Sequence, residues 1–153
     1  MIGRLVLLAV LLAPLAPALA QEPMTILAQK QWSASGVCVG LRQCGFCWAS
    51  ATVAPGVTLR VEPPRSVSVQ LSDPSHPAGS ALALEIGGES FTLAPHEDDF
   101  AATEEDAIRI IHAMRHAARL TLRLEGNSYP ANLDEFGAAY DAILESCPGT
   151  PAP

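Results

Sequence analysis

Alternating apolar and polar residues predict most of the structure in the middle of the chain. Four short runs between residues 57 and 93 alternate in this way, and Pro or Gly bounds each of them. This is the pattern of a strand with one buried face. The runs cover residues 57–61, 67–71, 82–86 and 90–93. Gly87 and Gly88 separate the last two runs and tolerate positive φ, so we predict a tight β-hairpin there.

After residue 103 the apolar spacing changes from that of a strand to that of a helix. Thr103 is a good N-cap, and the three acidic residues that follow it complement the helix dipole. We therefore predict a helix over residues 104–117 with one buried stripe. The stripe consists of Ala107, Ile110, Ile111, Met114 and Ala118.

The alternating pattern returns over residues 120–124, with a turn predicted at 125–128 and a partner strand at 129–133. Asp134 is predicted to cap a last helix that ends near Ser146. One face of that helix carries Phe136, Tyr140, Ile143 and Leu144. The predicted fold class is α+β: a mainly antiparallel, sandwich-like sheet, with two packed helices in the C-terminal half and disulfide staples.

The first twenty residues have the features of a secretory signal peptide. They contain Arg4, an apolar run over residues 5–12 and the small-x-small ending Ala18-Leu19-Ala20. Pro14 and Pro17 interrupt the segment, which is shorter than the roughly 20 apolar residues that span a bilayer. We predict cleavage near Ala20/Gln21, a periplasmic or secreted protein, and no transmembrane segment in the mature chain.

The remaining chain is predicted to form one domain. Residues 21–31 lack sustained periodicity and are interpreted as a flexible lead-in or a loose first strand. Residues 32–147 are expected to form a single globular domain, and residues 148–153 a disordered tail. Within the domain, the glycine-rich segment 32–47 is expected to be a turn-rich, disulfide-stapled ribbon.

The charge balance argues against nucleic acid as a partner. The chain has 16 acidic and nine basic residues, and loss of Arg4 with the signal peptide changes its formal charge from −7 to −8. Such a charge repels nucleic acid and anionic lipid headgroups. We expect the partner to be an envelope protein or ligand.

The four cysteines, Cys38, Cys44, Cys47 and Cys147, would lie in an oxidising compartment, where two disulfides are expected. Three pairings are open, and each of them joins Cys147 to the 38–47 segment. Cys44 and Cys47 also have the C-x-x-C spacing of thiol–disulfide oxidoreductases, with Cys44 as the nucleophile. We favour structural disulfides, because any helix starting at Cys44 would soon meet Pro55. We therefore expect an exported binding or structural protein without a catalytic site, and a thiol–disulfide oxidoreductase that uses Cys44 and Cys47 is the alternative.

His112 and His116 stand four residues apart on the predicted helix and could share a metal ion. A zincin would need Glu at position 113, where this chain has Ala113. We favour surface histidines near a helix C-terminus. No metal or other cofactor is predicted, and His112 and His116 are kept as candidates.

Other candidate sites have weaker patterns. Residues 96–99 (His-Glu-Asp-Asp) lack the ligand spacing and glycine of a calcium loop, and no serine lies in a G-x-S-x-G context. No catalytic residues are therefore predicted. Trp32 and Trp48 flank the cysteine-rich segment, and we expect them to pack on a disulfide.

Three features together distantly resemble the invasion-associated locus B family of exported bacterial proteins. The first is the signal peptide with Trp32 and Cys38 near the mature start. The second is the helix over 104–117 that runs into the strand 120–124. The third is the segment 129–140, YPANLDEFGAAY. The resemblance implies a small, β-rich, non-enzymatic protein of the periplasm or envelope, and it implies no particular ligand.

Overall fold

The computed structural model describes residues 22–38, 44–72 and 81–148. The predicted signal peptide lies outside the described residues, as does the predicted tail apart from Pro148. In the described part of the chain, no helix is long and apolar enough to cross a membrane.

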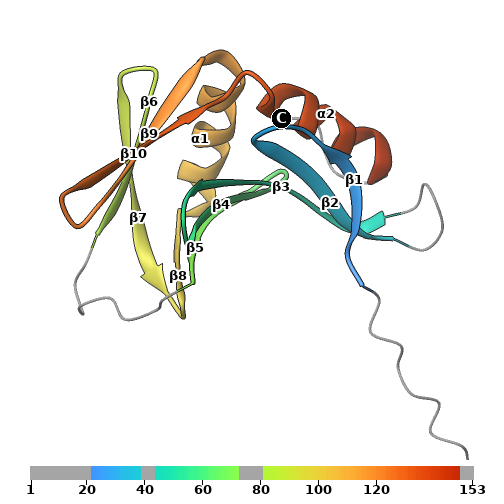
Figure 1. Cartoon of the computed structure of the whole chain (residues 1–153), viewed down its shortest axis with the longest axis horizontal. Coiled ribbons are helices and arrows are strands. Elements are labelled where there is room, and N and C mark those ends of the chain that lie inside the picture. The colour runs from blue at the N-terminus through green and yellow to red at the C-terminus, as the bar shows by residue number, and fades with distance from the viewer. Residues whose placement is uncertain (1–21, 39–43, 73–80, 149–153) are drawn as a thin grey trace, which may run out of the picture.

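Within the described residues, ten antiparallel strands form one curled sheet, and two helices pack against it (Figure 1). In chain order the strands are β1 (Met24–Ala28), β2 (Trp32–Cys38), β3 (Cys44–Ala54), β4 (Val57–Glu62), β5 (Ser66–Leu71), β6 (Leu82–Ile86), β7 (Glu89–His96), β8 (Asp99–Ala101), β9 (Arg119–Leu124) and β10 (Asn127–Asn132). Their order in the sheet is β1-β2-β3-β4-β5-β8-β7-β6-β9-β10, so β8 joins the two halves. The predicted α+β class with a mainly antiparallel sheet is confirmed.

The predicted hairpin between β6 and β7 is present, and its turn residues Gly87 and Gly88 have φ of 59° and 91°. The turn of the β9–β10 hairpin is shorter than predicted. Glu125 and Gly126 alone form the turn, with φ of 51° and 79°. Because two residues suffice to reverse the chain, β10 begins at Asn127 rather than at residue 129.

The N-terminal part of the sheet is more regular than the sequence predicted. Of the two interpretations of residues 21–31, the structure shows a strand, with β1 paired to β2 over Met24–Ala28. The turn-rich ribbon predicted over 32–47 is corrected to two paired strands on either side of residues 39–43, which lie outside the described residues. Gly36 lies within β2, so it does not mark a turn. Its lack of a side chain leaves room for the sulfur of Cys47.

Helix α1 (Glu104–His116) begins as predicted, because the Thr103 hydroxyl oxygen accepts a hydrogen bond from the Asp106 N–H at 3.2 Å. Its buried residues are Ala107, Ile110, Ile111 and Met114. The assignment of Ala118 to this stripe is wrong. The backbone becomes extended at Ala117, and Ala118 is exposed just before β9.

Helix α2 (Phe136–Ser146) does not use Asp134 as its cap, so that prediction is wrong. The Asp134 N–H donates to Asn132 Oδ1 at 2.7 Å, and the Asp134 carboxylate accepts from Asn132 Nδ2 at 3.0 Å. The N-cap position belongs to Glu135, whose side chain makes no capping hydrogen bond. Asp134 is therefore held in a local turn one residue too early to cap the helix.

The core lies between the sheet and the helices. Helix α2 packs on β1, β2 and β3, and α1 packs on β5 and β6. Trp32 is fully buried against the edge of Phe136, with ring centroids 4.8 Å apart, and its indole N–H donates to the Asn132 carbonyl at 2.9 Å. The prediction that Trp32 packs on a disulfide is thus replaced by an aromatic contact with α2.

Candidate functional site

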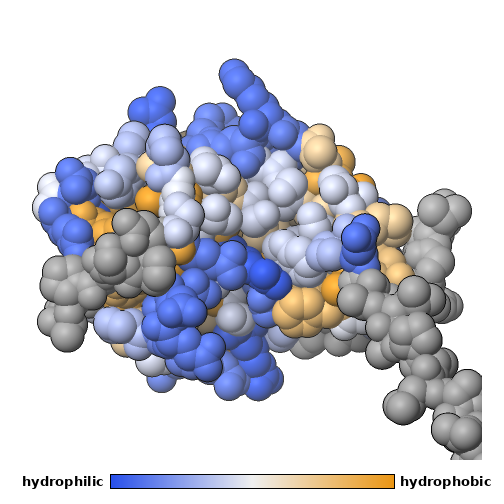
Figure 2. All heavy atoms as spheres, turned by 60° about the horizontal axis from the view of Figure 1, so that its bottom comes forward, coloured by the Kyte–Doolittle hydropathy of each residue, from blue (hydrophilic) through white to orange (hydrophobic). Residues whose placement is uncertain are grey.

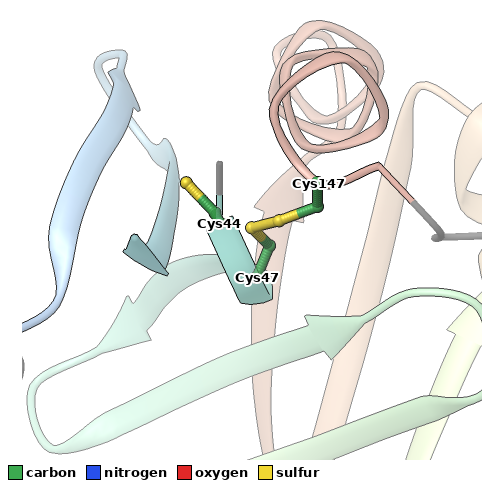
Figure 3. Close-up of side chains that lie close together, drawn as sticks. All are labelled: Cys44, Cys47 and Cys147. Carbon is green, nitrogen blue, oxygen red and sulfur yellow. A yellow bond between two sulfur atoms is a disulfide. The ribbon is translucent and has the colours of Figure 1, made fainter. Parts of the chain in front are cut away.

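Two disulfides staple β3 to its surroundings, as predicted. Cys38–Cys44 links β2 to the start of β3, and Cys47–Cys147 links β3 to the residue after α2. The second bridge spans 100 residues of sequence. Figure 3 shows this bridge between β3 and the end of α2, with Cys44 nearby on the same strand.

A β-bulge places Cys44 and Cys47 on the same buried side of β3. Residues three apart in a regular strand point to opposite faces. Here Val37 pairs with Phe46 while Cys38 pairs with Cys44, so Gly45 is left without a partner in the ladder. As a result, the sulfur atoms of Cys44, Cys47 and Cys147 all lie within 4.8 Å of one another.

The pairing bears on the oxidoreductase alternative. The oxidised form of a catalytic C-x-x-C is a bond between its own two cysteines. In this structure Cys44 is bonded to Cys38, Cys47 is bonded to Cys147, and both Cys44 and Cys47 are buried. All four cysteines are therefore bonded in a pairing other than that of an oxidised catalytic C-x-x-C, and none of them is a free thiol.

An aromatic and charged cluster occupies the opposite, outward face of β3 and β4. Phe46 is 48% exposed, and its ring centroid lies 5.8 Å from that of Trp48. The Arg60 guanidinium stacks over the Trp48 ring at 4.2 Å, and Arg60 Nε lies 2.8 Å from Glu62 Oε1. We call Phe46, Trp48, Arg60 and Glu62 the aromatic–arginine patch.

The prediction that Trp48 packs on a disulfide is wrong, because strand alternation directs its side chain away from its buried neighbour Cys47. Its partner is Arg60, which the sequence could not assign because the pairing depends on the register of β3 with β4.

The surface around the patch is polar but carries few charges. Small hydroxyl side chains occupy the outward positions of β2 to β5: Ser33, Ser35, Ser50, Thr52, Thr58, Ser66 and Ser68. The Ser33 and Ser50 hydroxyl oxygens lie 3.3 Å apart across β2 and β3. In Figure 2 the side turned forward shows pale residues of near-neutral hydropathy beside a strongly hydrophilic region.

A concave surface, which we call the α1 groove, lies between α1 and the β6–β7 hairpin. It encloses about 520 Å³, and its lining includes Ile86, Glu89, Ile108, Arg109, His112 and His116. Ile108 is 45% exposed. The sequence candidates His112 and His116 lie here side by side, with ring centroids 4.7 Å apart. The sequence alone shows the four-residue spacing of the two histidines. It does not show the groove, because the groove depends on the β6–β7 hairpin that faces α1.

The acidic segment at residues 96–99 forms a tight turn between β7 and β8. His96 ends β7 and pairs with Asp99, which begins β8. The Asp99 carboxylate accepts a hydrogen bond from Gln70 Nε2 at 3.5 Å. Among the described residues, only Cys44, Cys47 and Cys147 bring three metal-binding side chains together, and these are engaged in disulfides.

Two titratable groups near the core have shifted pKa values. Glu135 has a lowered pKa, mainly because the Gln31 backbone N–H donates to its carboxylate at 2.8 Å, with a further hydrogen bond from the Trp32 N–H. Tyr140 has a raised pKa because burial disfavours its phenolate. Its hydroxyl is buried and has no hydrogen-bond partner in the described part of the structure.

Comparisons with known proteins do not identify the chain. No family model matches it, and neither the curated proteins nor the solved structures give a significant match.

Proposed function

We propose that this chain is an exported, non-catalytic binding protein of the cell envelope that uses the aromatic–arginine patch as its binding surface. The exported location rests on the sequence of residues 1–20 and on the four cysteines, all of which form disulfides. Kinship with the invasion-associated locus B family is part of this proposal, and it rests on the sequence features described above.

The observation that carries the proposal is the exposure of Phe46 beside a stacked Trp48 and Arg60. Phe46 is 48% exposed and lies beside Trp48, so the two rings form adjoining apolar surface that a partner can remove from water. Aromatic residues and Arg are enriched at the centres of protein–protein interfaces. Phe46, Trp48 and Arg60 therefore have the composition of a binding hot spot.

The neighbourhood of the patch also suits a protein partner. Arg60 is held by stacking on Trp48 and by Glu62, so it loses little conformational freedom when a partner binds. The hydroxyl-bearing face around it can exchange hydrogen bonds with water for hydrogen bonds with a partner. Few charges need to be desolvated on this face.

Site-specific photo-crosslinking in the producing cell tests the proposal. The crosslinking residue p-benzoylphenylalanine replaces Phe46, which preserves an aromatic ring at that position. The matched control carries the same residue in place of Thr92, an exposed outward position of β7 in the other half of the sheet. We expect a discrete protein adduct from position 46 and none of that mass from position 92.

Adding Arg60→Ala to the position-46 probe separates a specific contact from random collision. We expect the adduct yield to fall at least fivefold, because Arg60 supports the ring of Trp48 and supplies charge. The absence of any adduct from position 46, or the same adducts from both positions, contradicts the proposed binding surface.

The exported location is tested separately on the mature protein. N-terminal sequencing of the protein purified from the envelope fraction is expected to begin at Gln21. Recovery of the full-length chain from the cytoplasm, with reduced cysteines, would contradict export while leaving the patch open to its own test.

A further inference from the structure

The α1 groove contains a pair of histidines that the binding role proposed above does not use. We propose that His112 and His116 together bind a late first-row divalent transition metal, of the class Cu²⁺, Ni²⁺ and Zn²⁺. Imidazole nitrogen is a preferred ligand for these ions, and Cu²⁺ is bound most tightly in the Irving–Williams order.

The geometry of the pair suits a shared ion. Residues four apart project from the same face of a helix, and the two imidazole rings have centroids 4.7 Å apart at an interplanar angle of 55°. Metal–nitrogen bonds of about 2.0–2.1 Å require the two ligating nitrogens to lie within about 4 Å of each other. Both side chains are exposed, so they can rotate about their side-chain bonds to reach that separation.

The charges around the pair also favour a cation. His116 is the last residue of α1, and the C-terminal end of a helix carries a partial negative charge. Arg109 also lines the groove, and its guanidinium is paired with Glu89 at 3.1 Å and with Asp106 at 3.3 Å. Arg115 on the same helix is paired with Asp141 at 3.0 Å. These carboxylates offset the two arginine charges.

The groove leaves room for the remaining ligands of the metal. Two imidazoles supply two positions, and water or a small chelating anion completes the coordination from the open side of the 520 Å³ groove. Ile86 and Ile108 give that space an apolar wall, which suits an organic ligand carried on the metal. The class of ligand is therefore a transition-metal ion, alone or chelated by a small carboxylate.

The test is a Cu²⁺ titration of the metal-free mature protein with both disulfides intact. Calorimetry gives the stoichiometry and affinity, and electron paramagnetic resonance reports nitrogen ligation. We expect one equivalent of Cu²⁺ bound through two imidazole nitrogens. His112→Gln and His116→Gln each remove one ligand, and each is expected to weaken binding at least tenfold. Gln is a good helix former, so the helix is retained.

His96→Gln is the matched control, because His96 is exposed and lies on β7 outside the groove. It is expected to bind Cu²⁺ as the wild type does. The double variant His112→Gln/His116→Gln keeps the other histidines and measures background binding. Binding by wild type no tighter than by this double variant, or unchanged nitrogen signals in it, would overturn the proposal.

A second readout does not depend on copper. Because an ion that binds only the folded state raises its stability, Zn²⁺ is expected to raise the melting temperature of wild type and of His96→Gln but not of the double variant. An equal shift in all three proteins would count against the site.

Discussion

Gly36 of β2 lies so close to Cys47 of β3 that a Cβ atom added at residue 36 would stand 2.6 Å from the Cys47 sulfur. The same added atom would lie 3.2 Å from the Cβ of Cys44. The disulfide cluster therefore packs directly over a strand position that has no side chain. A side chain at residue 36 would overlap space that the atoms of Cys44 and Cys47 occupy.

Replacing Gly36 with Ala is expected to destabilise the domain by about 1–3 kcal/mol, the usual cost of overpacking a close-packed core. The matched control is Gly45→Ala, since a Cβ at Gly45 meets nothing within 4 Å. Urea denaturation of the oxidised proteins measures both changes. If the two alanine variants lose the same stability, the cluster does not need the space at Gly36.

The two disulfides are expected to contribute unequally to stability. In the chain-entropy account, a bridge closing about 100 residues is worth about 4.7 kcal/mol, and one closing about six residues is worth about 2 kcal/mol. Cys47→Ala/Cys147→Ala should therefore lose about 2–3 kcal/mol more than Cys38→Ala/Cys44→Ala in urea denaturation. Because each double variant removes a whole bridge, no free thiol complicates the comparison. Equal losses would contradict the loop-length argument.

The disulfide pairing itself is open to direct measurement. Trypsin cleaves after Arg42 and chymotrypsin after Phe46, so together they separate all three N-terminal cysteines. Non-reducing mass spectrometry is expected to find Cys38 joined to the peptide of Cys44, and Cys47 joined to that of Cys147. A Cys44–Cys47 peptide that exchanges readily with glutathione would instead favour the oxidoreductase alternative.

The sequence predicts the regular part of the fold well, because alternation and helical spacing are local properties. The strands from β4 to β7 and the apolar face of α1 follow directly from them. It predicts the N-terminal strands poorly. There the glycines that suggested turns serve other purposes, since Gly36 makes room for Cys47 and Gly45 forms a bulge.

The candidate sites depend on long-range register, which a single sequence does not contain. Phe46 and Trp48 are visible as aromatics near cysteines, but Arg60 joins them only through the pairing of β3 with β4. In the same way, the spacing of His112 and His116 is local, whereas the groove beside them is made by a hairpin that the chain forms some 20 residues earlier.

Glu135 links the β1–β2 turn to the start of α2 through hydrogen bonds from two backbone N–H groups, those of Gln31 and Trp32. These bonds favour the carboxylate, so the pKa of Glu135 is lower in the folded state than in the unfolded state. The contribution of the Glu135 carboxylate to the free energy of unfolding is therefore fully present above the pKa of the unfolded state. It is lost as the pH falls through the pKa of the folded state.

We expect Glu135→Gln to be less stable than wild type at pH 7, and the difference between them to shrink as the pH falls below 4. Thermal melts from pH 7 to pH 3 measure this. Glu145→Gln on α2 is the control, because Glu145 is exposed. A constant difference in melting temperature across the whole pH range would show that the stabilisation by Glu135 does not depend on its negative charge.

Tyr140 buries its hydroxyl without a hydrogen-bond partner in the described structure, and that burial also raises the pKa of the phenol. An unsatisfied buried hydroxyl costs roughly 1–3 kcal/mol in proteins, so Tyr140→Phe is expected to keep or raise the free energy of unfolding, by up to about 1 kcal/mol. The ring remains in place against Phe136 and beneath the Arg115 guanidinium. Tyr129→Phe on β10 is the control and should be neutral. A loss of more than about 1 kcal/mol in Tyr140→Phe would mean that the hydroxyl has a stabilising partner, such as a buried water molecule, between the sheet and α2.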